Sequence, residues 1–215
     1  MGVPVLVIGA SGSGKSSSLR NFENDEIGLI NVVGKPLPFK STLKYARLQN
    51  SQAVREALST GTRNAYIIDD AQYLMSFEEM DTNLGGYDKW NSIGYGFIGL
   101  VRSVYEMPES TVVYFLMHTE VGDDGKLKAK TLGKLIDNHY TLEGLFSVVL
   151  MCVGNKERHY FTTKNDGGST VKTPPAMFDQ DEIDNDLKAV DTAIRDYWAL
   201  EPLKKSTNKK GTANA

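Results

Sequence analysis

A segment near the N-terminus has the residue types and the spacing of a phosphate-binding loop. Residues 9–16 read GASGSGKS and match the pattern G-x-x-x-x-G-K-[ST] in full. Glycines let the backbone curl so that successive N–H groups point inward at an oxyanion, and the start of a helix adds partial positive charge. The pattern therefore predicts a nucleoside triphosphate site formed by Gly9, Ala10, Ser11, Gly12, Ser13, Gly14, Lys15, Ser16 and Ser17.

Within this loop, Lys15 is predicted to reach the β- and γ-phosphates of ATP, and the Ser16 hydroxyl is predicted to bind Mg²⁺. A second metal ligand is expected at the end of another strand, where the apolar run AYII leads into Asp69 and Asp70. Carboxylates in that position lie at the ligand edge of an α/β sheet. Asp69 is predicted to hold Mg²⁺ through water. Asp70 occupies the place where many ATPases carry the glutamate that polarises the attacking water, although aspartate is one methylene shorter.

The next predicted strand also ends in polar residues that can take part in catalysis. His118 is placed to bind the γ-phosphate or water, and Glu120 is an alternative general base. The sequence leaves open which acid is the base, and His118 is equally compatible with a structural role. His139 and His159 have no partner at metal-ligand spacing, so no zinc site is expected.

Cations gather in the second half of a chain whose net charge is -3. Because the whole molecule is not a polycation, contact with nucleic acid must come from a local patch. Two functional interpretations remain open: contact with the phosphates of a DNA strand, or cations offered to the γ-phosphate of a neighbouring subunit. For any single lysine, a solvated surface position is the simpler explanation. The residues concerned are Lys128, Lys130, Lys134, Lys156 and Arg158, with Lys126, Lys164 and Lys172 nearby.

The elements that must position these residues follow from alternating apolar and helical segments. Continuous apolar strands indicate a sheet covered on both faces, and strand–helix alternation indicates an α/β fold with mostly parallel pairing. Gly154-Asn155 predicts a tight antiparallel hairpin at one edge. Strands are expected at 3–9, 27–33, 65–70, 111–118, 145–153 and 158–164, and helices at 15–21, 52–59, 91–105, 129–139 and 181–200.

The expected organisation is an ATPase core over residues 1–178, a C-terminal helix over 179–200 and a flexible basic tail over 201–215. The single cysteine, Cys152, lies in an apolar run and is expected to pack in a strand, which fits a reducing compartment. No stretch reaches the roughly 18 apolar residues of a membrane span, and the N-terminal apolar run is too short for a signal peptide. A cytoplasmic location without membrane contact is expected.

Taken together, the motifs resemble those of bacteriophage RecA-like ATPases, especially the Sak-type single-strand annealing ATPases and related phage AAA family ATP-binding proteins. The similar segments are GASGSGKSSSLRNF, YIIDDAQYL, the strand ending in HTE, LKAKTLGKLIDNHYTLEGLFSVVL and RHYFTTKNDGGSTVKTPPAMF, within residues 3–179. The resemblance implies a RecA-like P-loop core that forms a homo-oligomeric ring or filament and binds single-stranded DNA. It also implies Mg²⁺-dependent ATP hydrolysis linked to strand annealing in phage recombination or replication in the bacterial cytoplasm, with a single-strand-binding protein as partner.

One departure from RecA concerns the catalytic acid. RecA carries its glutamate after an earlier strand, whereas INVVGKPLPF at residues 30–39 contains no acid, so the base is assigned to Asp70 or Glu120. Three rival functions remain: a phage motor or helicase-loader ATPase, a nucleotide-gated interaction protein that does not hydrolyse, and a small-molecule P-loop kinase. The kinase is the weakest, because its arginine-rich lid has no counterpart among seven dispersed arginines.

Overall fold

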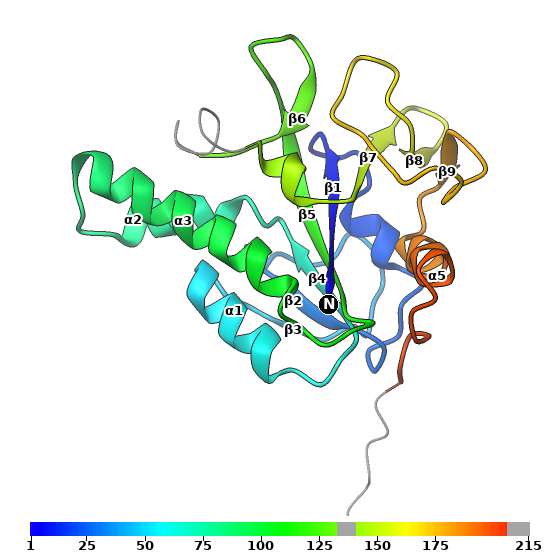
Figure 1. Ribbon diagram of the computed structural model, residues 1–215, viewed down its shortest axis with the longest axis horizontal. Helices are drawn as coiled ribbons and strands as arrows, with labels where there is room; N and C mark the ends of the chain where they lie inside the picture. The colour runs from blue at the N-terminus through cyan, green and yellow to red at the C-terminus, as the bar shows by residue number, and fades with distance from the viewer. Residues whose placement is uncertain (133–140, 206–215) are drawn as a thin grey trace, which may run out of the picture.

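A mixed sheet runs through the centre of the computed structural model, which describes residues 1–132 and 141–205 (Figure 1). Nine strands are present within these described residues, in the order β3-β2-β4-β5-β1-β7-β8-β9, with β6 paired to β5. The strands are β1 (Val3–Gly9), β2 (Gly28–Asn31), β3 (Tyr45–Ala46), β4 (Ala65–Asp69), β5 (Val112–Val121), β6 (Leu127–Ala129), β7 (Val148–Gly154), β8 (His159–Thr162) and β9 (Glu182–Asp184).

The parallel part of the sheet is built around β1, which pairs in parallel with β5 on one side and with β7 on the other. Four consecutive residues of β1, Val5 to Ile8, are fully buried. A strand that is covered on both faces has no solvent-facing side chains, which explains why its sequence is continuously apolar. The parallel pairs β2–β3, β2–β4 and β4–β5 extend the sheet, so the expected mostly parallel α/β architecture is confirmed.

Helices cover the two faces of the sheet (Figure 1). The helices α1 (Ser51–Thr60), α2 (Tyr73–Asp81) and α3 (Gly86–Val104) lie on one face, and their buried side chains pack with Leu6 and Ile8. The 3₁₀ helix η1 (Ser16–Leu19) and α5 (Leu187–Tyr197) lie on the other face and pack with Val5 and Val7. Alternate residues of β1 therefore belong to two separate cores, as the period of a strand requires.

Several elements differ from the expectation in the N-terminal half. The helix expected over 15–21 is only the four-residue η1. The helix α2 and the short strand β3 were not expected, and α3 begins at Gly86 instead of residue 91. The helices α2 and α3 are in contact with each other, a tertiary interaction that the periodicity of each separate segment does not reveal.

The C-terminal half differs more. The helix expected from Ala129 does not begin there, because residues 127–129 form β6 against β5, and residues 133–140 lie outside the described residues. The predicted antiparallel pairing of β7 and β8 is confirmed, but residues 155–158 make a longer turn than the predicted two-residue one. The helix expected from residue 181 starts at Leu187, because Asp186 caps it through the backbone N–H groups of Lys188 and Ala189.

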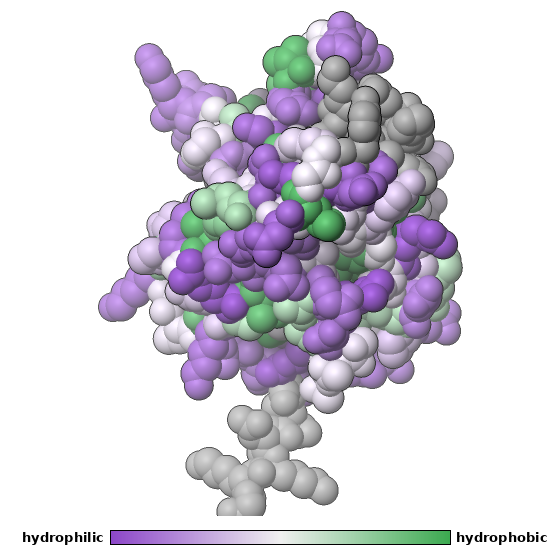
Figure 2. Space-filling view, turned by 90° about the vertical axis from the view of Figure 1, so that its left-hand side faces the viewer, coloured by the Kyte–Doolittle hydropathy of each residue, from purple (hydrophilic) through white to green (hydrophobic). Residues whose placement is uncertain are grey.

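The segment before α5 forms β9, which pairs with β8 and extends the sheet. Within the described residues, no helix has both the length and the apolar character that crossing a membrane requires. The outer surface of the layer that contains α1, α2 and α3 is mostly hydrophilic, and its apolar residues are scattered (Figure 2).

Candidate functional site

A cleft of about 330 Å³ lies at the carboxyl ends of β1, β4 and β5. One wall is the glycine-rich loop after β1, from Ser11 to Ser17, and the opposite wall is the segment from Lys35 to Pro38 after β2. Asp70 and His118 lie between these walls. In open α/β sheets this edge is where ligands bind, so the sheet brings together polar residues that are distant in the sequence.

Glycines are required in the loop for two different reasons. Gly12 and Gly14 have φ angles of +78° and +103°, which L side chains rarely adopt. At Gly9, an added Cβ would lie 2.5 Å from Ser13 Oγ and 2.6 Å from the Cys152 carbonyl oxygen, so a side chain cannot be placed there. The spacing of glycines in the sequence therefore reflects the loop's conformation and its close contact with β7.

Lys15 lies under the loop and is only 5% exposed. Its Nζ donates hydrogen bonds to the carbonyl oxygens of Gly9, at 2.7 Å, and Ala10, at 2.9 Å. Burial lowers the pKa of Lys15, while the negative charges of Asp70 and Asp69 partly oppose this shift. The ammonium is thus positioned by the backbone of the loop itself and is costly to keep charged unless anions are near.

Ser16 lines the cleft, and its side chain meets that of Asp69, which is 53 residues away in the sequence. Ser16 Oγ donates to Asp69 Oδ1 at 2.9 Å. Asp69 is 1% exposed, and its Oδ2 has no hydrogen-bond partner among the described residues. Burial and the neighbouring charge of Asp70 raise the pKa of Asp69 to about 6, although the Ser16 hydrogen bond opposes this shift. A buried carboxylate oxygen without a donor is a ready ligand for a cation.

Asp70 is held between two side chains from different elements. Its Oδ2 lies 2.5 Å from Lys35 Nζ, and its Oδ1 lies 3.3 Å from His118 Nε2. Asp70 also has a φ of 61°, a left-handed conformation that is uncommon outside glycine. Burial and the nearby charge of Lys15 lower the pKa of His118, which favours a neutral imidazole, so Lys35 supplies the opposite charge to Asp70.

Three residues that line or support the cleft were not predicted from the sequence. Lys35 belongs to a segment interpreted only as a boundary after the second strand. His159 was predicted to have no metal partner, and its Nδ1 instead lies 2.7 Å from the Ser13 carbonyl oxygen, beside Gly14. The Gln72 side chain accepts from the His118 N–H at 3.2 Å. No local motif marks these residues, because each reaches the site only through the pairing of distant strands.

Cys152 packs in β7 as expected, with its Sγ 3.1 Å from the Ser13 carbonyl oxygen. Burial raises the pKa of its thiol to about 11. The thiol therefore supports the loop as a neutral group and is not an activated nucleophile.

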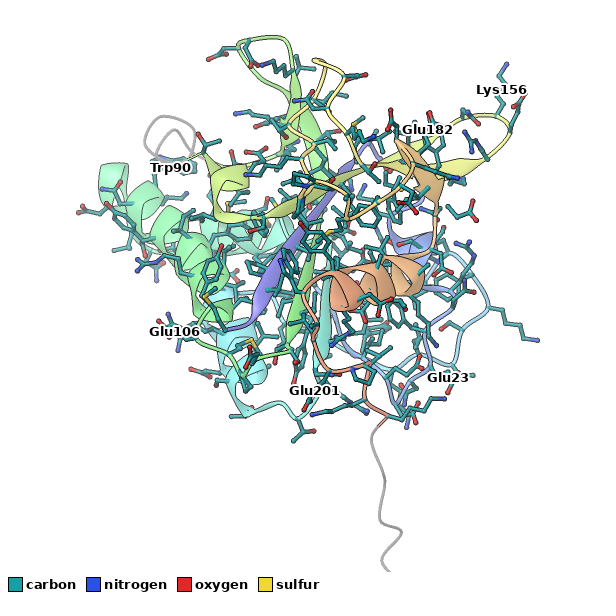
Figure 3. The ribbon with its side chains drawn as sticks, turned by 45° about the vertical axis from the view of Figure 1, so that its right-hand side comes forward. Glu23, Trp90, Glu106, Lys156, Glu182 and Glu201 are labelled. Atoms are coloured by element: carbon teal, nitrogen blue, oxygen red, sulfur yellow. The ribbon has the colours of Figure 1, made fainter. Side chains whose placement is uncertain are left out.

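Other predicted residues lie outside the cleft. The Glu120 side chain faces Lys128, with 3.5 Å between Oε1 and Nζ, and Glu120 is not among the residues that line the cleft. Lys130 is exposed, and its backbone N–H donates to the His118 carbonyl oxygen. Arg158 pairs with Glu182 and stacks on Tyr160, while Lys156 extends from the tip of the β7–β8 hairpin (Figure 3). Lys134 lies outside the described residues.

A larger cavity of about 680 Å³ lies at the other end of the sheet, near the residues that precede β4 and β5. It is lined by arginines and glutamates, among them Arg55, Arg102 and Glu106. No pair of buried carboxylates faces it among the described residues that line it. We assign the candidate functional site to the smaller cleft, because the buried residues Lys15 and Asp70 meet Lys35 and His118 there.

One hydroxyl and one carboxylate are candidate metal ligands: Ser16, which lines the cleft, and Asp69, which is buried and accepts a hydrogen bond from Ser16. Within residues 1–132 and 141–205 no group of three or more His, Cys, Asp or Glu residues could hold a metal ion by itself. Mg²⁺ commonly uses one or two protein ligands together with phosphates and water, so such a group is not needed for it. No protein-family model matches the chain, and no curated protein matches its sequence.

Proposed function

We propose that this protein is a P-loop nucleoside triphosphatase of RecA-like type that binds ATP with Mg²⁺ in the cleft. The observation that carries the proposal is the 2.9 Å hydrogen bond between Ser16 Oγ and Asp69 Oδ1, next to the loop-bound Lys15. A hydroxyl after the loop lysine and a strand-end carboxylate are the two groups that hold Mg²⁺ in such enzymes. Their contact across 53 residues of sequence supports a shared ligand.

The residues present fit a bound cation and an anionic ligand. Asp69 Oδ2 is buried without a donor among the described residues, and the raised pKa of Asp69 shows that its charge is poorly compensated. A divalent cation would compensate that charge and would, when bound, neutralise phosphate charge and polarise the terminal phosphate. At Gly12, which lines the cleft, an added Cβ would meet no atom within 4 Å, so the loop backbone is open there.

We assign the remaining roles in hydrolysis to different side chains. Lys15 binds the β- and γ-phosphates, and the loop amides orient them. Asp70 acts as the general base that accepts a proton from the attacking water, because it faces the cleft whereas Glu120 does not line it. His118, as a neutral imidazole 3.3 Å from Asp70, positions that carboxylate and offers a hydrogen bond to water or phosphate.

We further propose that hydrolysis serves the handling of single-stranded DNA by a homo-oligomer, in phage recombination or replication, with strand annealing as the reaction. The supporting observation is that β6 and the β7–β8 hairpin both extend from the end of the sheet that carries the cleft (Figure 1). These hairpins carry Lys128, Lys156 and Arg158. Cations on extensions beside a nucleotide site are suited either to DNA phosphates or to a neighbouring subunit's nucleotide.

The test is release of phosphate from ATP with Mg²⁺, with and without single-stranded DNA, beside a gel shift at two salt concentrations and a measurement of oligomer mass. We expect slow turnover that rises with single-stranded DNA, and DNA binding that weakens with salt. Absence of phosphate release under all conditions would contradict hydrolysis. Turnover that depends on a small acceptor instead of DNA would favour a kinase.

A further inference from the structure

Lys35 enters the cleft from the wall opposite the glycine-rich loop. Among the described residues, Lys15 and Lys35 are the two lysines that line the cleft. Lys15 is fixed to the loop carbonyls, whereas the side chain of Lys35 is 50% exposed and its Nζ lies 2.5 Å from Asp70 Oδ2. Lys15 is therefore part of the loop, whereas the ammonium of Lys35 is already partly in solvent and can change its partner.

The backbone of Lys35 is positioned by a buried side chain. Asn31, at the end of β2, is fully buried and uses both ends of its amide on the following turn. Its Nδ2 donates to the Lys35 carbonyl oxygen at 2.7 Å, and its Oδ1 accepts from the Gly34 N–H at 2.8 Å. Gly34 has a φ of +77°, and Asn31 pairs with Asp69 in the β2–β4 register. This turn is thus built to hold Lys35 beside the carboxylates.

The structure points to a role for Lys35 that rests on the proposed nucleotide site. We propose that Lys35 is the residue that distinguishes a nucleoside triphosphate from a diphosphate, by moving its ammonium from Asp70 to the terminal phosphate. The loop amides and Lys15 serve either nucleotide. Lys35 binds the additional phosphate, whose oxygens carry more negative charge than one carboxylate.

The exchange also changes Asp70. While Lys35 is paired with Asp70, its ammonium lies against Oδ2, so that oxygen is not open to a water molecule. When the terminal phosphate takes the ammonium, Asp70 keeps its contact with His118 and its oxygen Oδ2 is available to a water molecule. The base is thereby freed only when a triphosphate is present. Breaking the pair leaves the buried Asp70 carboxylate without its cation, so the interaction of Lys35 with the terminal phosphate must offset that loss.

The experiment measures the affinity of ADP and of a non-hydrolysable ATP analogue, both with Mg²⁺, for the full chain and its variants. In Lys35→Met we expect the affinity for the ATP analogue to fall about 10-fold to 100-fold, as for removal of a charge-assisted hydrogen bond. The affinity for ADP stays within about twofold of wild type, because ADP leaves Lys35 on Asp70. Lys40→Met, which removes an exposed lysine of the same segment outside the cleft, keeps both affinities.

A second variant tests the exchange itself. Asp70→Asn releases Lys35 in advance, so the ATP analogue should bind more tightly, and this gain should shrink in the Lys35→Met/Asp70→Asn double variant. Equal loss of both nucleotides in Lys35→Met, or no loss of either, would overturn the inference while leaving the proposed function standing. Failure of the wild-type protein to bind either nucleotide would overturn the proposed function and this inference with it.

Discussion

Two clusters of buried charge lie at opposite ends of the sheet and differ in how completely they are paired. In the Arg195 cluster (Tyr114, Asp191 and Arg195), Arg195 donates to Asp191 and to the carbonyl oxygens of Asn64, Ser110 and Glu201. Tyr114 donates to the same carboxylate at 2.8 Å. In the cleft cluster (Lys15, Lys35, Asp69, Asp70 and His118), Asp69 Oδ2 has no partner among the described residues.

The difference supports a structural role for the Arg195 cluster and the proposed ligand-binding role for the cleft cluster. The Arg195 cluster joins α5 to the residues just before β4 and β5, and both oxygens of its carboxylate are used. The cleft cluster combines an unpartnered oxygen, a left-handed Asp70 and a half-exposed Lys35. Buried charges that are fully paired stabilise one conformation. Buried charges with incomplete pairing lower the stability of the folded protein, and binding of a ligand restores that stability.

The largest effect on folding is expected at the Arg195 cluster. Arg195→Met leaves the buried Asp191 carboxylate without its cation, which should lower the free energy of unfolding by about 3–5 kcal/mol. Urea unfolding measures this, with Lys164→Met as control, since Lys164 forms an exposed ion pair with Asp181. If the two variants unfold alike, the claim that this cluster carries structural stability is wrong.

Next in size is the loss of function at Lys15. Lys15→Ala should lower ATP turnover about 10²–10³-fold, as when one preorganised donor to a transition state is removed. Its melting temperature should not fall much, because burial of the charged ammonium is unfavourable, as the lowered pKa of Lys15 indicates. Turnover and thermal unfolding are measured on the same preparation. If Lys15→Ala keeps the turnover of wild type, the proposed role of Lys15 in hydrolysis is wrong.

A smaller effect, dependent on pH, is expected at Asp69. The pKa of Asp69 is raised from 3.8 to about 6 in the folded protein, so its contribution favours folding at low pH and is lost as the pH rises through about 6. Asp69→Asn does not titrate and should be more stable than wild type at pH 8 by on the order of 1–3 kcal/mol, but not at pH 4. Urea unfolding at both pH values measures the difference.

The same titration predicts that Mg²⁺-dependent nucleotide binding by wild type weakens below about pH 6, since Asp69 must lose its proton to bind metal. Fluorescence titration with labelled nucleotide measures this, over a range from about pH 5 to about pH 8 that brackets the pKa of Asp69.

For the stability prediction, a difference in free energy of unfolding between wild type and Asp69→Asn that is the same at all pH values would contradict the assignment of a poorly compensated carboxylate.

The smallest effect is expected on DNA binding, for the lysines between residues 128 and 134, of which Lys128 has Glu120 as an acidic neighbour. Replacing Lys128, Lys130 and Lys134 by Gln should leave DNA-free turnover unchanged and weaken binding of single-stranded DNA. The slope of log affinity against log salt should fall by roughly 0.7 for each DNA phosphate that the variant no longer neutralises. A control triple at Lys40, Lys44 and Lys204 removes equal charge elsewhere and should keep the slope. Equal slopes in both triples would contradict the DNA surface.

The parts of the molecule that the sequence predicted well are those set by contiguous residues. The strands β1, β4, β5 and β7 were found because a buried strand requires an unbroken apolar run. Asp69 was placed at a strand end by the same reasoning. The start of α5 was missed, although Asp186 is a residue type that caps helices and could have marked it.

The sequence by itself determined the loop, its glycines and the strand-end acids, because backbone conformation and strand burial depend on neighbouring residues. Only the tertiary structure decided which atoms meet: Ser16 with Asp69, Lys35 with Asp70, and His159 with the loop at Ser13. These contacts depend on the order and register of strands that are distant in sequence. The altered pKa of Asp69 likewise exists only after folding, since removal of water and the approach of another charge produce it.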